Sequence, residues 1–420
     1  MEQYGLIGGQ LSHSFSKPIH EALGGYAYAL MPMPEDAVRR LFAERPFAAL
    51  NVTIPYKQTV IPLCDEIDSR AAQIGAVNTV VNRDGRLFGY NTDFDGFLYM
   101  VRRLGVDPAH KRVMILGSGG TCKTVKAVMQ YCGAGEVTVV SRRKSAGTVT
   151  YEEAAALSDT QILVNASPCG MYPENDGLPI DLACFRQLGT VFDVVYNPLR
   201  TRLMEEAAQR GIPHMGGLRM LVAQAKYASE LFTGKRISDT RIEEIYRALA
   251  LEKANLVLCG MPSAGKTTLG KAAAAKMGRR FVDLDDEIVK ETGMDIPSIF
   301  EQKGEAWFRQ REAAAAARLS KENGLVLACG GGTVLREENV RRLKQNGTLC
   351  LIDRPLPLLA GGNGRPLAQN AKQVAALYEA RMPVYRACAD FVVAFDGEDE
   401  ASAEQTVKEI EERFYETACD

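Results

Sequence analysis

The residues Gly260–Thr268, GMPSAGKTT, match the pattern G-x-x-x-x-G-K-T. They follow the apolar run Leu256–Cys259, which is typical of a buried strand, and precede a helix that we expect to begin near Lys266. In this setting the backbone N–H groups of the loop and of the helix N-terminus bind phosphate groups, while the lysine reaches the terminal phosphates and the Thr267 hydroxyl holds Mg²⁺. We therefore expect nucleotide contacts at Gly260, Ser263, Ala264, Gly265, Lys266, Thr267 and Thr268.

The bulk properties of the chain limit its organisation and its partners. A single hydrophobic core stops growing at roughly 250 to 300 residues, so a chain of 420 residues predicts two or three domains. Hydrophobic residues make up 46% and charged residues 24%, the balance of a globular protein. A net charge of -2 gives no electrostatic footprint for nucleic acid, and no apolar run approaches the length of a membrane-spanning helix. We expect neither a nucleic-acid nor a membrane partner.

The chain start and the cysteines indicate a cellular compartment. The first residues, MEQYGLIGGQ, contain no basic segment followed by an apolar core, so we expect no secretion signal. The ten cysteines form no C-x-x-C pair, and Cys259 and Cys350 stand in apolar runs. They are typical of small buried thiols. The sequence thus predicts a reduced, cytoplasmic protein without a disulfide or zinc framework.

Polar motifs follow the phosphate loop at intervals. The stretch 281–289, FVDLDDEIV, predicts a strand that ends in Asp283 and Asp285, two residues apart and so on one side of the strand. A phosphotransferase needs one acid near Mg²⁺ and another to orient the attacking hydroxyl, although two such acids alone are more often solvent-exposed. Further along, Arg309 lies in GEAWFRQRE, Gly330–Gly332 follow the apolar run LVLAC, and RPL begins at Arg365. Glycines directly after a buried strand let a ligand approach the backbone closely.

In this order and at these intervals, residues 254–420 resemble shikimate kinase. The resemblance implies that Asp285 positions the shikimate hydroxyl and is the candidate base, while Asp283 supports the hydrated Mg²⁺ together with Thr267. Planar, bidentate guanidinium groups suit a carboxylate, and charge on the transferring phosphoryl group needs a cation. The resemblance assigns the carboxylate to Arg309 and Arg381, further substrate contacts to Gly331 and Gly332, and the phosphoryl charge to Arg365.

Two features depart from the kinase pattern. The segment 355–367, PLPLLAGGNGRPL, corresponds to the lid of the family but is short and lacks the basic residue usually found before its glycines. In the phosphate loop, Ser263 stands where the family often has glycine.

A second glycine-rich turn, GSGGTCK at 117–123, lies between the apolar strand 112–116 and a helical stretch. Cys122 stands where the dinucleotide fingerprint has a third small residue. The next strand ends about twenty residues later, as a βαβ nucleotide-binding unit requires. There the chain carries the basic turn 141–144, SRRK, instead of an acidic residue, and positive charge favours the 2'-phosphate of NADP. An exposed basic turn without a ligand is the alternative interpretation.

Before this turn stand the polar clusters SHSFSKPIH, NVTIPYK, GAVNT and GYNTDFDG. They occupy expected strand ends and turns, where a small polyhydroxylated acid would find hydroxyl and amide partners. Lys57 and Asp93 are a natural acid/base pair, because a lysine beside a carboxylate passes a proton to or from a carbonyl group. Taken individually, each residue is more often part of a surface ion pair.

Together with NASPCGM, DVVYNPLRTRL and GGLRMLVAQ, these clusters resemble shikimate dehydrogenase over about residues 1–250. The resemblance implies that Lys57 and Asp93 are catalytic. It places the substrate on Ser14, Ser16, Asn51, Thr53, Asn78, Tyr196 and Gln224. It places NADP on Gly117, Gly119, Gly120, Ser141, Arg142, Met171, Val194 and Gly217, with Met171 and Gly217 bordering the nicotinamide. In the basic turn, Ser141 and Arg143 differ from the usual N-R-T.

The two resemblances imply an α/β architecture. We expect a dehydrogenase substrate-binding domain of residues 1–100 plus 218–250, a Rossmann NADP-binding domain of 101–217, and a P-loop NTPase domain of the nucleoside monophosphate kinase type at 254–420. The implied function is a bifunctional enzyme of aromatic amino acid biosynthesis. It would reduce 3-dehydroshikimate with NADPH, then phosphorylate shikimate to shikimate 3-phosphate with ATP and Mg²⁺. The open alternative is a quinate/shikimate dehydrogenase that uses NAD, joined to a weak or non-catalytic kinase-like binding module.

Overall fold

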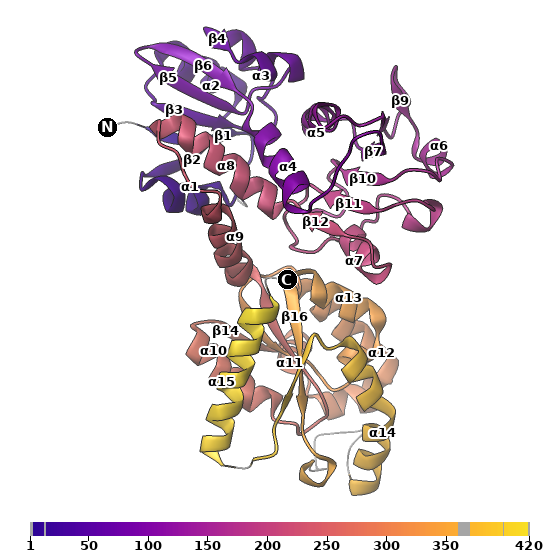
Figure 1. Ribbon diagram of the computed structural model, residues 1–420. Helices are drawn as coiled ribbons and strands as arrows, with labels where there is room; N and C mark the ends of the chain where they lie inside the picture. Colours follow the sequence, from indigo (N-terminus) through magenta and orange to yellow (C-terminus); the bar gives the residue numbers. More distant parts are fainter. Residues whose placement is uncertain (1–2, 12–13, 360–369, 398, 419–420) are drawn as a thin grey trace. The chain divides into compact units, whose positions relative to one another are not determined.

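The computed structural model describes residues 3–11, 14–359, 370–397 and 399–418 (Figure 1). The chain divides into two compact units. The first comprises the residues up to Asn197 together with Thr201–Tyr246, and the second comprises Pro198–Arg200 together with the residues from Arg247 onward. The boundary falls within α9 (Thr240–Lys253). In the described part of the chain, no helix combines the length and apolar character needed to cross a membrane.

The first unit begins with a mixed sheet of strand order β2-β1-β3-β5-β6-β4. A tight hairpin joins β5 to β6, and its central residues Asp84 and Gly85 both have positive φ, as an Asp-Gly pair predicts. The strands are β1 (Tyr4–Gly8), β2 (Tyr28–Pro32), β3 (Ala49–Val52), β4 (Glu66–Ile67), β5 (Thr79–Arg83) and β6 (Arg86–Tyr90). The helices of this region are α1 (Ser16–Gly24), α2 (Glu35–Glu44) and α3 (Ser69–Ile74).

A parallel sheet follows in the same unit, with strand order β12-β11-β10-β7-β8-β9. The order reverses at β7, and in such sheets ligands bind at the carboxyl ends of the strands beside this point. The glycine-rich turn comes directly after β7. The strands are β7 (Arg112–Leu116), β8 (Glu136–Val140), β9 (Thr148–Val149), β10 (Ile162–Asn165), β11 (Thr190–Asp193) and β12 (His214–Gly216), with helices α5 (Gly120–Tyr131), α6 (Tyr151–Ala155) and α7 (Arg202–Gln209).

Helices α4 (Thr92–Arg103) and α8 (Leu218–Thr233) lie side by side in the first unit (Figure 1). Gly96 makes this close packing possible. A Cβ at Gly96 would lie 2.8 Å from the Met220 carbonyl oxygen and 2.9 Å from the Gln224 Cβ. Because α4 carries Asp93 and α8 carries Gln224, the distance between these helices sets the distance between two predicted site residues.

The second unit is built on a parallel sheet of order β14-β15-β13-β16-β17, with the first strand of the unit in the middle. Every residue of β13 is buried, as expected for a strand covered on both faces. Figure 1 shows α10 and α15 on one side of this sheet and α12, α13 and α14 on the other. The strands are β13 (Asn255–Cys259), β14 (Arg280–Asp283), β15 (Leu325–Ala328), β16 (Gly347–Asp353) and β17 (Phe391–Ala394). The helices are α10 (Lys266–Met277), α11 (Leu284–Thr292), α12 (Ile296–Leu319), α13 (Glu337–Asn346), α14 (Ala371–Cys388) and α15 (Glu400–Thr417).

One expectation about local structure was wrong. Asp283 and Asp285 do not share one side of a strand, because β14 ends at Asp283 and Asp285 lies in the first turn of α11. The Asp283 carboxylate accepts the Asp285 N–H at 3.0 Å, which is the side-chain cap that begins a helix. A second break falls in α12, where Gly304 has the non-helical angles φ 81° and ψ 165°, so the segment that carries Arg309 starts its own helical run.

Replacing Gly96 by alanine is expected to force α4 away from α8. Overpacking of this kind costs about 1 to 3 kcal/mol. The free energy of unfolding of Gly96→Ala, measured by urea denaturation, should fall by that amount. The control is Gln130→Ala, an exposed position on α5, where a change within about 0.5 kcal/mol is expected. Equal stability of the two variants would contradict the close packing.

Candidate active sites

Lys57 and Asp93 form a close, largely buried ion pair in the first unit. The Lys57 Nζ donates to the Asp93 Oδ2 at 2.6 Å, and the side chains are 18% and 9% exposed. Asp93 lies in the first turn of α4, whose N-cap Asn91 accepts the Phe94 N–H at 3.1 Å. Asp93 therefore lies at the helix N-terminus, where the unpaired backbone N–H groups point. The ammonium group of Lys57 is held beside a fixed carboxylate, the arrangement predicted for an acid/base pair.

A chain of hydrogen bonds joins three of the predicted substrate residues. The Asn51 Nδ2 donates to the Thr79 Oγ1 at 3.1 Å, and that hydroxyl donates to the Asn78 Oδ1 at 3.0 Å. The Asn78 Nδ2 in turn donates to the Gln224 Oε1 at 3.0 Å. The Asn78 Oδ1 also accepts the backbone N–H of Thr92 at 2.7 Å, one residue before Asp93. Through Asn78 the amide chain is therefore linked to the backbone next to Asp93.

Tyr28 is a member of this chain that the sequence analysis missed. Its hydroxyl donates to the Asn51 Oδ1 at 2.7 Å, and the side chain is 1% exposed. The ring of His20 stacks on that of Tyr28 with 4.1 Å between centroids. Burial lowers the pKa of His20 to about 3, so this ring is neutral at physiological pH. Tyr28 lies in β2 and Asn51 in β3, on opposite sides of β1. No local sequence motif indicates a contact between residues this far apart in the chain.

The serines and Tyr196 come together through one aromatic contact. Ser14 and Ser16 are linked by a hydroxyl hydrogen bond of 3.1 Å, and Phe15 between them meets the Tyr196 ring edge-on at 5.3 Å. Thr53 lies just after β3, where its N–H donates to the Ile7 carbonyl oxygen at 3.0 Å. Through the Phe15 contact, the segment Ser14–Ser16 lies beside Tyr196, which follows β11.

The glycine turn after β7 packs closely against a neighbouring backbone segment at Gly117 and leaves space beside Gly119 and Gly120. Gly117 has φ 100°, and a Cβ there would lie 3.0 Å from the Ala166 carbonyl oxygen. At Gly119 and Gly120, by contrast, an added Cβ meets nothing within 4 Å, so the backbone at the start of α5 is open to a ligand. Such open N–H groups at a helix N-terminus fit the pyrophosphate of a dinucleotide.

The basic turn lies next to the glycine turn. The hydroxyls of Ser118 and Ser141 are 3.2 Å apart, which joins the two turns directly. Arg142 and Arg143 are exposed, whereas Lys144 pairs with Glu153. The guanidinium groups are therefore available to a phosphate beside the dinucleotide site.

Two further predicted cofactor residues, Val194 and Gly217, meet through their backbones. A Cβ at Gly217 would lie 2.1 Å from the Val194 carbonyl oxygen, so only glycine fits at this contact. Met171, a third predicted cofactor residue, is 42% exposed. The sequence missed Asp193, which anchors the segment after β11. Its buried carboxylate accepts hydrogen bonds from Thr201, Asn165 and Val195, while burial raises its pKa to about 7.

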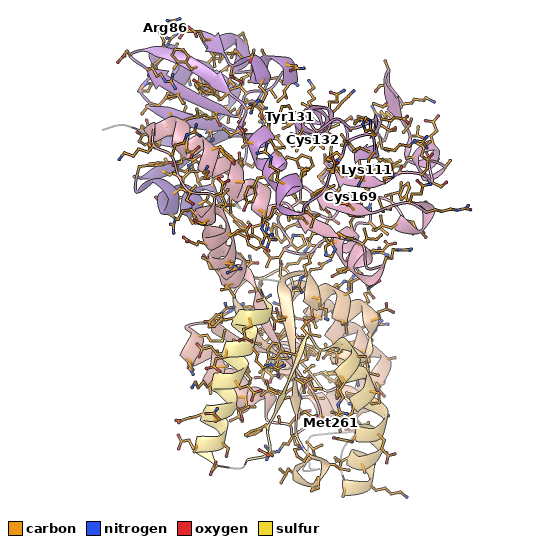
Figure 2. All side chains as sticks on the ribbon, in the orientation of Figure 1. Arg86, Lys111, Tyr131, Cys132, Cys169 and Met261 are labelled. Atoms are coloured by element: carbon orange, nitrogen blue, oxygen red, sulfur yellow. The ribbon has the colours of Figure 1, made fainter. Side chains whose placement is uncertain are left out.

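The phosphate loop of the second unit follows the central strand β13. Gly260 and Gly265 have φ 137° and 92°, and a Cβ at Gly260 would lie 2.7 Å from the Ile352 carbonyl oxygen. The Lys266 Nζ donates to the carbonyl oxygens of Gly260 and Met261 at 3.0 and 2.8 Å, and burial lowers the pKa of this lysine. Met261 marks the loop in Figure 2.

Ser263 adopts the backbone conformation that the family fills with glycine. Its φ is 67°, in the left-handed region, which costs a residue with a Cβ roughly 1 to 2 kcal/mol. Ser263 is therefore held in a strained backbone conformation. Ala264, the next residue, is buried.

Thr267 and Asp283 lie together at the start of α10. The Thr267 Oγ1 donates to the Asp283 Oδ2 at 2.8 Å. Within the described ranges, no group of three or more histidine, cysteine or acidic side chains is placed to hold a metal ion. A hydroxyl and one carboxylate beside a phosphate loop nevertheless fit Mg²⁺, which keeps several waters and binds through one or two protein groups plus substrate phosphates. Thr268, the last predicted nucleotide contact, is exposed on the same helix.

Asp285 is a carboxyl group of this site with a raised pKa. Burial, reinforced by the charges of Asp283 and Glu312, raises its pKa to about 6. Its Oδ1 is buried and has no hydrogen-bond partner among the described residues. A Cβ at Gly330 would lie 2.7 Å from that oxygen. The unpaired oxygen beside a glycine fits a hydroxyl group of a ligand.

The glycine turn Gly330–Gly332 brings the predicted acceptor residues together. The Arg381 Nη1 donates to the Gly331 carbonyl oxygen at 3.0 Å. A Cβ at Gly332 would lie 2.2 Å from the Nη1 of Arg309. Arg309 also pairs at 2.9 Å with Glu312, a fully buried carboxylate that the sequence analysis missed. Two carboxyl groups, of Asp285 and Glu312, and two guanidinium groups therefore surround this turn. Arg365 lies outside the described residues.

Tyr28→Phe is expected to remove the hydrogen bond that holds the Asn51 side chain. The variant leaves a buried carbonyl oxygen without its donor, which costs about 1 to 3 kcal/mol. Thermal unfolding should report this loss. The control is Tyr131→Phe, because Tyr131 is 66% exposed and lies on α5 (Figure 2). A Tyr28→Phe protein as stable as the control would show that the hydroxyl does not hold Asn51.

Comparisons with known proteins agree with this division into two sites. The family model for the shikimate dehydrogenase substrate binding domain matches residues 6–80, and that for shikimate kinase matches residues 262–412. The shikimate dehydrogenase (NADP(+)) of Clostridium perfringens is 32% identical over 268 residues, which cover 59% of this chain and 98% of that protein. The enzyme of the same name from Methanopyrus kandleri is 38% identical over 261 residues, covering 55% and 90%.

Solved structures extend the likeness through the first unit. A shikimate 5-dehydrogenase from Thermus thermophilus, solved with NADP(H) and shikimate, is 31% identical with a TM-score of 0.54, covering 59% of this chain and 99% of that one. A chorismate mutase/shikimate 5-dehydrogenase fusion protein from Clostridium acetobutylicum is 30% identical with a TM-score of 0.56, covering 59% and 97%. The chain therefore belongs to the shikimate dehydrogenase family and carries a shikimate kinase domain after its dehydrogenase part.

Proposed function

We propose that the first unit reduces 3-dehydroshikimate to shikimate with NADPH, and that the second phosphorylates shikimate to shikimate 3-phosphate with ATP and Mg²⁺. The observation that carries the first activity is the 2.6 Å Lys57–Asp93 pair, whose Asp93 follows Thr92 of the amide chain. The C. perfringens and M. kandleri relatives are named as NADP(+) enzymes, so a quinate dehydrogenase that uses NAD is not favoured. A cytoplasmic location is part of the proposal, and the free thiols of the described cysteines support it.

The proposal assigns three functional regions. Residues 1–100 plus 218–250 bind the substrate of the dehydrogenase, residues 101–217 bind NADP, and residues 254–420 form the kinase. The reversal of strand order at β7 and the phosphate loop after β13 support the two nucleotide assignments.

In the first unit, NADPH would, when bound, supply the hydride for reduction of the substrate carbonyl. Lys57 holds a proton at its Nζ and gives it to the carbonyl oxygen as negative charge develops there. Asp93 orients the Lys57 ammonium group through their 2.6 Å hydrogen bond. Asn51, Asn78 and Gln224 bind the ring hydroxyls, since amides both donate and accept hydrogen bonds. We assign the substrate carboxylate to Ser14 and Ser16, with Thr53 and Tyr196 completing the site.

For the dinucleotide, the open backbone at Gly119 and Gly120 would hold the pyrophosphate, and Arg142 would pair with the 2'-phosphate. Ser141 joins the same turn through its contact with Ser118. Val194, Met171 and Gly217 would border the nicotinamide, with Gly117 fixing the turn.

In the second unit, ATP supplies the phosphoryl group and Mg²⁺ neutralises its charge. Asp285 accepts the proton of the attacking hydroxyl at its unpaired oxygen, while Arg309 and Arg381 hold the carboxylate of the acceptor beside Gly331 and Gly332. Lys266 binds the terminal phosphates, and Thr267 with Asp283 holds the hydrated metal. Arg365 stays a prediction for charge on the transferring group.

Paired variants test the two activities against each other. Lys57→Met removes the proton donor, and loss of general acid catalysis costs about 10² to 10⁴ in rate. NADPH oxidation with 3-dehydroshikimate should fall by that factor, while ADP formation with shikimate stays unchanged. Lys266→Ala should give the reverse pattern, so each variant is the control for the other. Wild-type protein no faster than the relevant variant would remove that activity from the proposal.

The kinase rate should depend on the ionisation of Asp285. The carboxylate form accepts the proton, so activity is present above its pKa of about 6 and is lost as the pH falls through that value. The kinase kcat/KM, measured from about pH 5 to 8, should show this acidic limb. Asp285→Asn should lose the activity at every pH. A wild-type profile that stays flat across this range would exclude Asp285 as the base.

A further inference from the structure

A buried carboxylate lies at the carboxyl end of the parallel sheet in the first unit. Asp193 is the last residue of β11, and its side chain is fully buried. Its Oδ1 accepts the backbone N–H of Val195 and the Nδ2 of Asn165, each at 3.0 Å, and its Oδ2 accepts the Thr201 hydroxyl at 2.7 Å. A buried charged or polar group is costly unless it is hydrogen-bonded, so the carboxylate and its three donors hold one another in place.

The three donors come from three different segments. Asn165 ends β10, and Val195 follows β11, which pairs with β10. Thr201 is the N-cap of α7, where its Oγ1 accepts the Met204 N–H at 3.4 Å. The Asp193 carboxylate therefore joins two adjacent strand ends to the start of a helix.

The first of these segments leads to Met171. The Asn165 Oδ1 accepts both the N–H and the hydroxyl of Ser167, at 3.1 and 2.7 Å. The Asn165 Nδ2, which donates to Asp193, also donates to the Cys169 carbonyl oxygen at 3.2 Å. Cys169 marks this turn in Figure 2. Asp193 thus fixes the orientation of the Asn165 side chain, which in turn holds the residues just before Met171.

The other two residues predicted to border the nicotinamide are connected to the same carboxylate. The Val194 N–H donates to the Asn165 carbonyl oxygen at 2.9 Å. The Gly217 N–H donates to the Val195 carbonyl oxygen at 3.0 Å. Val194 and Gly217 are therefore held by the two residues that donate to the Oδ1 of Asp193.

We propose that Asp193 is a positioning residue for the nicotinamide end of the dinucleotide site, and that its carboxylate holds the segments carrying Met171, Val194 and Gly217 at the spacing that the ring requires. Because its side chain is fully buried, Asp193 acts through these segments and not by touching the ligand. This role rests on the proposed NADPH-dependent reduction.

The effect of Asp193 is expected to be confined to one end of the dinucleotide. Gly119 and Gly120, which we assign to the pyrophosphate, follow β7, and Arg142, which we assign to the 2'-phosphate, follows β8. The hydrogen bonds of Asp193 go instead to β10, to the residues after β11 and to the start of α7. Loss of the carboxylate should therefore loosen the nicotinamide end and leave the adenosine end as it is.

The test compares two ligands on the full chain. NADPH reaches both ends of the site, whereas adenosine 2',5'-bisphosphate carries the adenosine and the 2'-phosphate but no nicotinamide. In Asp193→Ala, the dissociation constant of NADPH should rise about tenfold, the factor that corresponds to one buried donor left unpaired. That of adenosine 2',5'-bisphosphate should not change. Isothermal titration calorimetry measures both constants, and a general folding defect would weaken both ligands together.

Two further variants serve as rescue and control. In Asp193→Asn the amide oxygen replaces Oδ1 as an acceptor and the amide nitrogen donates to the Thr201 oxygen, so NADPH binding should return to near the wild-type value. The matched control is Asp181→Ala, since Asp181 is an exposed aspartate of the same region that accepts the Ala183 N–H at 2.8 Å. Both ligands should bind to this variant as they bind to the wild type.

Thr201→Val tests the same hydrogen bonds should Asp193→Ala fail to fold. It removes one donor of the three and should weaken NADPH binding by a smaller factor, again without a change for adenosine 2',5'-bisphosphate. Equal NADPH affinity of wild type and variant, or an equal loss for both ligands, would overturn the positioning role. Wild-type protein that binds neither ligand would overturn the proposed NADP function, and this role with it.

Discussion

Burial of parallel strands on both faces is the constraint on which this molecule depends. Strands such as β13 and β10 are buried at every position, and their polar side chains, Asn255 and Asn165, stand only at the strand ends. Reactive groups are therefore confined to the residues that follow the carboxyl ends of the strands, where backbone groups are also free to bind phosphate. The phosphate loop after β13, the glycine turn after β7 and Gly330–Gly332 after β15 all follow from this one restriction.

The two candidate sites use different kinds of side chain at the strand ends. In the dehydrogenase part, amide and hydroxyl side chains bond to one another, with Asn78 contacting partners from β3, β5, α4 and α8. In the kinase part, glycines let charged side chains approach, and the acceptor residues are held by long charged groups from α12 and α14. A network of neutral groups suits a polyhydroxylated ring, whereas guanidinium groups around an unpaired carboxyl oxygen suit an anionic alcohol.

Local patterns predicted candidate site residues at strand ends. The phosphate loop, Lys57, Asp93 and the glycine turns could be found because each motif is short and stands at a fixed place relative to a strand. Tyr28, Glu312 and Asp193 could not, since each acts through a partner whose side chain is brought near only by the folded sheet. The apolar alternation predicted a strand through Asp285. The strand instead ends at Asp283, because the Asp283 carboxylate accepts the Asp285 N–H and so caps the helix that begins there. The positive φ of Ser263 could not be predicted either, because a serine in a sequence does not indicate a left-handed backbone conformation.

The glycine turn beside Asp285 also limits how the acceptor site can change over evolution. A methyl group at Gly330 or Gly332 would collide with Asp285 or Arg309 at 2.7 or 2.2 Å, so substitution there disturbs the groups that we propose act on the acceptor. At Gly331 the nearest atoms are those of Pro262 at 3.0 Å and Arg381 at 3.4 Å, and a shift of a few tenths of an ångström would admit an alanine. The middle glycine is thus the position of this turn where a small side chain would displace its neighbours least.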